Sequence, residues 1–490
     1  MVDIRIDGGT VLTLDSEGTV VDDGTVVVDD GKIVAVESSA DTRGEYDADQ
    51  VVDASGHAVL PGFVLPHTHV SDILFRGGVS NERSIYDWLY NVKKPGIHAM
   101  TPEDHAVASA LYSWEALRAG VTTFVELPDP VFMGGDHDVD AIVDAKLTEY
   151  HAAGVRNVYA QTFRDNPDIP DEFRTFIEQL RTTEPSVTDL PLDYALWEVD
   201  DVEALLEDQV SEYHDPSPGS RQRVWMAPEH IWTASREGLR RASEFADRHD
   251  AMTTTHVSET THDESGELTN VQYLATADYL GERTVLAHCV HVDERDVRLL
   301  STTDTKVAHN PLTNLVLGSG IAPVPTMDAA GVTVGLGTDN PSANDTIHPL
   351  SDARYAALVH RGHRRDAGAV TAERALEMVT RDGARAIGRE DELGSIEEGK
   401  RGDLVLVDLD YPHLTPCQNV APTLVKQAQG HEIETVLCEG EVVVENGRVP
   451  GVQTRHPDLL STAERHARAV IERSGLDGVL DRDWPRRSRR

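Results

Sequence analysis

The stretch VLPGFVLPHTH, residues 59–69, joins an apolar run to a pair of histidines. On a β-strand, side chains two residues apart point the same way, so His67 and His69 can aim two imidazoles at one point. Converging imidazoles are what a bound metal ion requires. The pair alone is weak evidence, because two polar loop residues would give the same pattern.

Seven further short apolar runs follow, most of them succeeded by a helical pattern. They are residues 121–127, 155–163, 224–228, 251–257, 284–290, 306–309 and 332–338. Together with residues 58–66 they make eight β/α units, which favours a (β/α)8 TIM barrel within the α/β class. An open doubly wound sheet is the alternative, but no Gly-x-Gly-x-x-Gly follows the first run.

The two ends of the chain differ from this central stretch. Both contain short strand-like segments separated by Gly/Asp turns, at residues 2–6, 10–14, 25–29, 32–37, 403–408, 435–438 and 441–445. Extra helices are predicted at residues 171–181, 201–214 and 462–473, and disorder at residues 486–490. We therefore predict a small composite β-sandwich (residues 1–60 and 391–450), a catalytic (β/α)8 barrel (61–390), and a C-terminal helix with a basic tail (451–490).

The chain carries a large negative charge. Its 490 residues include 44 Lys+Arg and 85 Asp+Glu, a formal net charge of −41. This charge repels phosphate, so neither nucleic acid nor a membrane is expected as a partner. Dispersed acidic residues with few lysines are typical of halophilic proteins. Three cysteines indicate no disulfide framework, and the absence of a leader or a long apolar run predicts a cytoplasmic protein.

Three later apolar runs also end in titratable residues. His256 and Glu259 close the fifth run, His288 closes the sixth, and Asp339 follows the eighth. Each alone is explained more simply as a hydrogen-bonded barrel residue. In a barrel, however, the carboxyl ends of all strands lie around one opening. It is therefore a poor explanation that four strands end in titratable residues at this opening by chance. Three histidines and a carboxylate suit a borderline divalent cation.

With these residues in view, the chain resembles the amidohydrolase superfamily. The resemblance lies in the motifs VLPGFVLPHTHVSDILFRGG, HVSE, AHCVHV, HNPLTNLVLGSGIAPV, GLGTDN and LGSIEEGKRGDLVLVDLD, in that order. The branch it indicates holds S-adenosylhomocysteine/methylthioadenosine deaminases and triazine hydrolases. The resemblance implies a distorted barrel with a composite β-sandwich and, because relatives are often oligomeric, a homo-oligomer.

The resemblance also assigns roles to individual residues. The implied metal ligands are His67, His69, His256 and Asp339, and Asp339 also takes a proton from water. Glu259 matches the acid that protonates the substrate ring, and His288 the residue that orients hydroxide. Two-metal relatives bridge their ions with a carboxylated lysine on the fourth strand, but this chain has no lysine between Lys146 and Lys306. One ion is therefore expected: zinc, with iron or manganese as alternatives.

The implied reaction is hydrolytic deamination of an amino-substituted N-heterocycle. Hydroxide bound to the metal attacks the ring carbon that bears the amine, and ammonia leaves. The ring can be a purine, pyrimidine, pterin or triazine. Displacement of chloride or an alkylamine from a triazine-like ring would use the same groups and is the alternative. A non-catalytic scaffold protein is the third and least expected alternative, because a scaffold has no need of proton-transfer groups.

Five further residues are candidates for substrate binding: Trp88, Glu229, His230, His309 and Asn310. Trp88 can either stack on a planar ring or pack in a lid. Nucleoside-processing relatives carry a ribose-binding glutamate shortly after this tryptophan, whereas residues 92–98 here contain no acid. This departure weakens the adenosine-type interpretation. Glu229 and His230, beside the end of the fourth run, can either face the ligand or form a loop salt bridge. An acidic pocket wall at this place would favour a neutral or cationic substrate.

Overall fold

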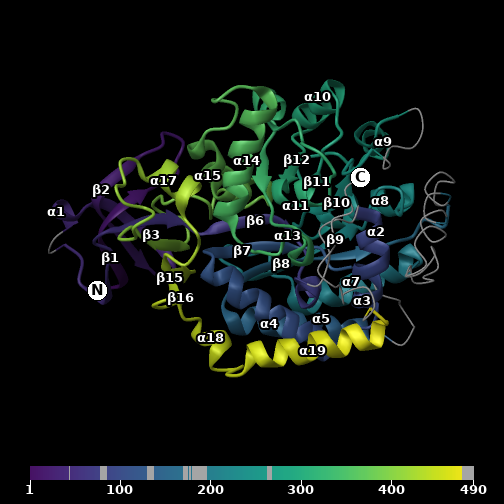
Figure 1. Cartoon of the computed structure of the whole chain (residues 1–490), viewed down its shortest axis with the longest axis horizontal. Coiled ribbons are helices and arrows are strands. Elements are labelled where there is room, and N and C mark those ends of the chain that lie inside the picture. Colours follow the sequence, from purple (N-terminus) through teal and green to yellow (C-terminus); the bar gives the residue numbers. More distant parts are fainter. Residues whose placement is uncertain are drawn as a thin grey trace, which may run out of the picture.

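The computed structural model describes residues 1–42, 45–77, 85–129, 137–168, 175, 178, 196–261 and 268–476. The helix predicted at residues 171–181 falls outside these ranges except at residues 175 and 178, and so does the basic tail at residues 486–490. The molecule has an α/β body with a strand-rich part at one end (Figure 1).

Eight parallel strands form the centre of the α/β body. The first four make one sheet: β6 (Phe63–Thr68), β7 (Val121–Glu126), β8 (Arg156–Phe163) and β9 (Gln222–Pro228). The other four make a second sheet: β10 (Thr253–Val257), β11 (Thr284–His288), β12 (Lys306–His309) and β13 (Val334–Leu336). Isolated parallel bridges link the two sheets on both sides, from His230 to His256 and from Thr68 to Asp339. Each of the eight apolar runs found in the sequence therefore overlaps one of these eight parallel strands.

The first run needs a correction, because it holds two strands rather than one. Residues 58–61 belong to β5 (His57–Pro61), which lies in a different sheet from β6. The chain passes between the two sheets at Gly62. A Cβ there would lie 2.2 Å from Oγ1 of Thr122, so only glycine allows this close approach.

Most of the described helices pack around the parallel strands (Figure 1). The longer ones are α4 (Pro102–Arg118), α5 (Val139–Ala153), α7 (Val199–Tyr213), α8 (Arg236–Arg248), α10 (Glu294–Thr303), α14 (Pro349–Arg364), α15 (Ala372–Val379) and α17 (Val420–Gln427). Shorter ones are α1 (Ser39–Thr42), η1 (Ser71–Phe75), α2 (Ile85–Trp88), η2 (Leu89–Lys93), α3 (Lys94–His98), α9 (Asn270–Thr276), α11 (Pro311–Val316), α12 (Val324–Ala329), α13 (Pro341–Asn344), α16 (Arg381–Ala386) and α18 (Pro450–Gln453). The helix predicted at residues 201–214 is α7. None of the described helices is both long and apolar enough to cross a membrane.

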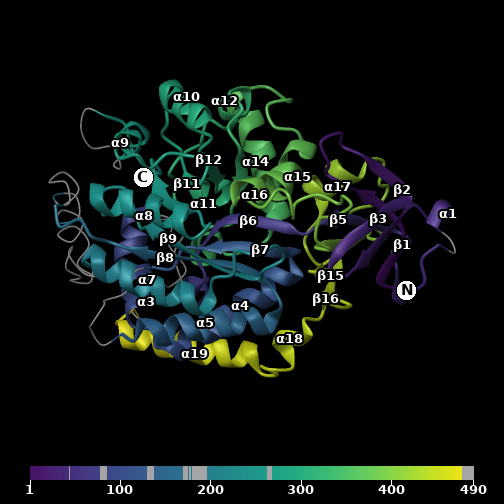
Figure 2. The same ribbon diagram turned by 180° about the vertical axis from the view of Figure 1, so that it is seen from behind.

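The predicted C-terminal helix is α19 (Leu459–Ser474). It lies along α4 at the bottom of the molecule (Figures 1 and 2). Its C-terminal end reaches a small apolar cluster in which Ile471 and Leu476 pack with Trp88 and Val92. The last helix therefore supports the segment that carries Trp88.

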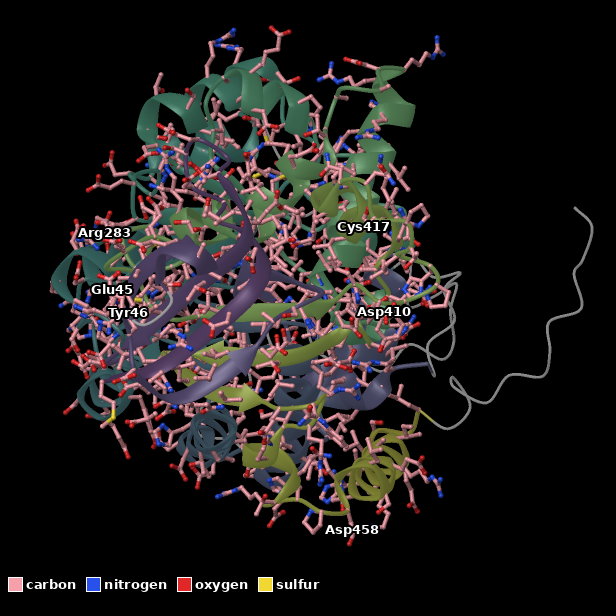
Figure 3. All side chains as sticks on the ribbon, turned by 90° about the vertical axis from the view of Figure 1, so that its left-hand side faces the viewer. Glu45, Tyr46, Arg283, Asp410, Cys417 and Asp458 are labelled. Atoms are coloured by element: carbon pink, nitrogen blue, oxygen red, sulfur yellow. The ribbon has the colours of Figure 1, made fainter. Side chains whose placement is uncertain are left out.

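Strands from both chain ends form one eight-stranded mixed sheet. Its members are β1 (Val2–Leu12), β2 (Val20–Asp29), β3 (Lys32–Ser38), β4 (Ala48–Asp53), β5, β14 (Leu404–Asp408), β15 (Ile433–Cys438) and β16 (Glu441–Val444). Figure 3 shows the early and late strands running side by side. The strands predicted at residues 2–6 and 10–14 are instead one strand, β1, whose register shifts between Asp7 and Val11. Gly8, with a φ of 84°, allows β1 to continue through this irregularity.

A buried ion pair ties the mixed sheet to the α/β body. Arg156 on β8 donates to the carboxylates of Asp403 and Glu439 and to the Ser220 carbonyl. Its side chain is fully buried. Removing one partner of such a pair leaves charge without compensation in a low-dielectric interior.

We predict that Arg156→Met lowers the free energy of unfolding by about 3–5 kcal/mol, because Asp403 loses its buried partner. Urea denaturation followed by circular dichroism would measure the change. Arg240→Met is the control, since Arg240 makes exposed ion pairs with Glu237 and Glu244 on α8 and its loss should change little. Equal stability of the two variants would contradict this role for Arg156.

Candidate metal-dependent active site

The predicted metal-ligand residues lie at the carboxyl ends of the parallel strands. His67 is near the end of β6, His256 is in β10, and Asp339 follows β13. The φ of Asp339 is 55° and that of His288, the last residue of β11, is 74°. Positive φ is uncommon for residues other than glycine and concentrates at functional sites. The backbone of Asp339 and of His288 thus adopts a conformation that local preference alone would not select.

The side chains meet at one place. Nε2 of His67 lies 3.2 Å from Oδ1 of Asp339, and Nε2 of His69 lies 3.5 Å from the same oxygen. Nε2 of His69 lies 3.3 Å from Nε2 of His256. His67, His69 and Asp339 are buried, and His256 is partly buried. The structure therefore brings together all four residues that the sequence singled out as metal ligands.

Two backbone carbonyls fix which nitrogen of each histidine faces this centre. Nδ1 of His69 lies 2.5 Å from the Leu127 carbonyl, and Nδ1 of His256 lies 2.5 Å from the Glu229 carbonyl. A carbonyl only accepts, so both Nδ1 atoms carry the proton and both Nε2 atoms present lone pairs. Burial, more than the neighbouring cationic groups, lowers the pKa of both histidines and favours their neutral forms.

The donor set suits a divalent cation. Two Nε2 lone pairs face each other beside a carboxylate, and Oδ2 of Asp339 is buried without a hydrogen-bond partner among the described residues. Electron-rich atoms this close repel unless a cation lies between them. Histidine nitrogens with one carboxylate oxygen are a ligand set that zinc accepts. Backbone carbonyls that orient the histidines are the usual support for such ligands.

Two predicted proton-transfer residues lie beside this cluster. Nε2 of His288 is 3.6 Å from Oε2 of Glu259 and 4.0 Å from Oδ2 of Asp339. Nδ1 of His288 lies 3.0 Å from Oδ1 of Asn314, which accepts its proton and turns Nε2 toward the centre. Sequence reasoning missed Asn314, although it closes the HNPLTN motif. Glu259 also accepts a hydrogen bond of 3.5 Å from the Ser319 hydroxyl.

A pocket opens beside the cluster. Among its lining residues are His69, His256, Glu259 and His288, together with the predicted Trp88, Glu229 and His230. Trp88 is 1% exposed and packs in the apolar cluster that includes Leu476. It also lines the pocket, so both uses predicted for this side chain, packing and a place in the pocket wall, fit its position. Sequence reasoning missed Tyr86, Tyr90, Lys93, Lys94, Asp129, Thr162, Trp232 and Asn340, which also line the pocket.

Two of the predicted substrate contacts lie outside the lining of this pocket. His309 and Asn310 do not line this pocket, because both are buried against other side chains. Nε2 of His309 lies 3.3 Å from Nε2 of His360, and Nδ2 of Asn310 lies 3.3 Å from Nδ1 of His288. Both residues therefore pack behind the wall.

At Glu229 the structure shows a salt bridge, which is one of the two alternatives that the sequence leaves open. The Glu229 carboxylate pairs with Nζ of Lys94 at 2.6 Å and with Nε of Arg164 at 3.2 Å. Burial alone would raise the pKa of Glu229, but Lys94 and Arg164 lower it to about 2. Glu229 is thus ionised at neutral pH and its charge is compensated by two cations. The sequence does not indicate which residues pair with Glu229, because Lys94 lies 135 residues away in the chain.

Comparison with known proteins agrees with this geometry, which is that of a metal-dependent hydrolase. The amidohydrolase family model matches residues 58–443. The S-triazine hydrolase of Gordonia rubripertincta is 33% identical over 99% of each chain. The 5-methylthioadenosine/S-adenosylhomocysteine deaminase of Thermococcus kodakarensis is 31% identical, over 84% of this chain and 88% of its own. The chain therefore belongs to the amidohydrolase family and is a hydrolase.

Solved structures show the same fold. An adenosine deaminase from Xanthomonas campestris with bound zinc matches with a TM-score of 0.82 and 26% identity, covering 96% of this chain and 99% of that one. The atrazine chlorohydrolase of Arthrobacter aurescens in complex with zinc matches with a TM-score of 0.83 and 24% identity, over 95% and 100%. Together with the family match, these neighbours imply a (β/α)8 barrel.

We predict that His67→Ala loses its bound divalent metal, because removing one ligand opens a site built from few donors. Elemental analysis of the purified protein would measure metal per chain. His151→Ala, an exposed position on α5, should keep the wild-type content. Full retention of metal by His67→Ala would remove this histidine from the ligand set.

Proposed function

We propose that this chain is a metal-dependent hydrolase that deaminates an amino-substituted N-heterocycle. The observation that carries the proposal is the position of Glu259, which lines the pocket and lies 3.6 Å from His288 beside the four candidate ligands. A carboxylic acid at this point can protonate a ring nitrogen while the ring carbon is attacked. Relatives named as deaminases of 5-methylthioadenosine, S-adenosylhomocysteine and 5'-deoxyadenosine support the reaction class.

Each polar group of the site has a separate task in this proposal. A divalent ion, zinc by preference, would be held by His67, His69, His256 and Asp339, and would supply hydroxide near neutral pH. Asp339 has one carboxylate oxygen without a hydrogen-bond partner in the described part of the chain, and this oxygen can take a proton. His288, oriented by Asn314, directs Nε2 at the point where charge develops. Glu259 moves a proton to the ring nitrogen and then to the leaving amine.

A second candidate reaction has specific support. The S-triazine hydrolase relative covers 99% of this chain, so displacement of chloride or an alkylamine from a triazine-like ring is the alternative. The same proton-transfer groups would serve it. The two reactions differ in the group that leaves.

The finer organisation is part of the proposal. The single bridges between the two parallel sheets support a distorted (β/α)8 barrel at residues 61–390. The mixed sheet with its own apolar core supports a β-sandwich domain formed by residues 1–60 and 391–450, with residues 451–490 as a C-terminal appendage. The charge of −41 supports function at high salt, in a cytoplasm rich in ions. A homo-oligomer remains a family expectation.

Ammonia release from aminopurines, aminopyrimidines, pterins and aminotriazines, with zinc and high salt, tests the reaction. We expect Glu259→Gln to retain its metal and to lose about 10²–10⁴ in kcat, because an amide cannot transfer the proton. Glu282→Gln, at an exposed position, should match the wild type. Release of chloride or alkylamine without ammonia would favour the second reaction, and an unchanged kcat in Glu259→Gln would contradict the role of Glu259.

A further inference from the structure

Two consecutive lysines are buried in the pocket wall, and the proposed reaction uses neither of them. Lys93 ends η2 and Lys94 begins α3, and their exposed fractions are 2% and 3%. Both line the same pocket as Glu259 and His288. Lysine is rarely buried, because its ammonium group loses solvation. Their position beside the chemistry therefore needs an explanation.

Each ammonium group is held by a carboxylate from a strand end. Nζ of Lys93 lies 3.0 Å from Oδ2 of Asp129, which follows β7, and Nζ of Lys94 lies 2.6 Å from Oε1 of Glu229, which follows β9. The anions thus come from the strand side of the pocket and the cations from the helical segment 85–98. Arg164 adds a second cation to Glu229.

Stability alone does not explain these two buried ion pairs. Apolar side chains of similar volume usually stabilise a protein as well as a buried ion pair does. Buried charges that border a pocket are more often kept for recognition or catalysis. An ammonium group has three N–H donors, and a carboxylate partner does not use them all. Lys93, which lines the pocket, can therefore donate to a ligand while Asp129 holds it in place.

The surroundings of the ammonium groups indicate the shape of the ligand. Nζ of Lys93 lies 5.5 Å from the centre of the Trp88 ring, and Nζ of Lys94 lies 5.8 Å from that of Tyr90. Both rings line the pocket. A planar ring that stacks in this aromatic wall would place an in-plane substituent close to the cations. A substituent with negative charge gains most from this arrangement.

We propose that Lys93 and Lys94 form an anion subsite, and that the substrate is an amino-substituted N-heterocycle carrying a carboxylate. This inference rests on the proposed deaminase function and narrows its substrate class. The amine would be at the end of the ring that faces Glu259, and the carboxylate at the end that faces the lysines. A cationic substrate is disfavoured, in contrast to the neutral or cationic substrate that an acidic pocket wall would favour.

Matched substrates test the subsite. Cytosine is compared with 5-carboxycytosine, and pterin with pterin-6-carboxylate, by ammonia release from the metal-loaded wild type. A charged hydrogen bond predicts a kcat/KM about 10- to 100-fold higher for the carboxylated member of at least one pair, mostly through a lower KM. Calorimetric titration of both members into Glu259→Gln measures binding without turnover.

A double substitution removes one of the two subsite cations without leaving its carboxylate partner unpaired. Lys93→Met/Asp129→Asn should lower the preference for the carboxylated ring, in both kcat/KM and binding, by about 10-fold or more. Lys306→Met/Asp304→Asn is the matched control, because that pair, 3.1 Å apart, lies at the opposite end of β12 from His309. The control should keep the full preference.

The possible results separate the two levels of the proposal. Deamination without any preference for the carboxylated ring, or a preference that survives Lys93→Met/Asp129→Asn, overturns the subsite and leaves the deaminase function in place. Ammonia from no ring in either form, with no binding to Glu259→Gln, overturns both. A preference that falls in the double variant and persists in the control supports the subsite.

Discussion

The site depends on two hydrogen bonds between histidines and the backbone. The carbonyls of Leu127 and Glu229 take the Nδ1 protons of His69 and His256, so that both Nε2 lone pairs point at one centre. These carbonyls follow β7 and β9, the neighbours of the strands that carry the histidines. A shift of either strand end would turn an imidazole away, and the metal centre would lose a donor. The parallel arrangement of the strands is thus a condition for the chemistry.

Glu229 links the proposed metal centre to the neighbouring pocket. Its carbonyl orients His256, while its carboxylate pairs with Lys94 from the helical segment and with Arg164 after β8. The other wall contact, Lys93 with Asp129, joins the same segment to the end of β7. Ile471 of α19 and Leu476, which follows this helix, belong to the same apolar cluster as Trp88. The pocket wall is therefore fixed both by charge from the strand ends and by apolar packing from the C-terminal helix.

Local patterns in the sequence predict most of the strands and the titratable residues at their ends, and the family resemblance selects the four candidate ligands among these residues. Apolar runs located the strands, and titratable residues at the ends of those runs located His67, His256 and Asp339, because a barrel brings its strand ends together. The same reasoning failed at Gly62, where one apolar run crosses between two sheets, since hydrophobicity does not report which sheet a strand joins. It left Glu229 open between a ligand contact and a salt bridge, because the partner Lys94 lies 135 residues away. Pairing over that distance is decided by tertiary structure.

The central claim is that a single divalent ion is coordinated by side chains from β6, β10 and the end of β13. Anomalous diffraction at the zinc edge, from crystals grown with zinc, tests it most directly. The account predicts one strong peak within bonding distance of His67, His69, His256 and Asp339. A peak elsewhere, two peaks within this cluster, or imidazoles that turn away from a common centre would contradict it.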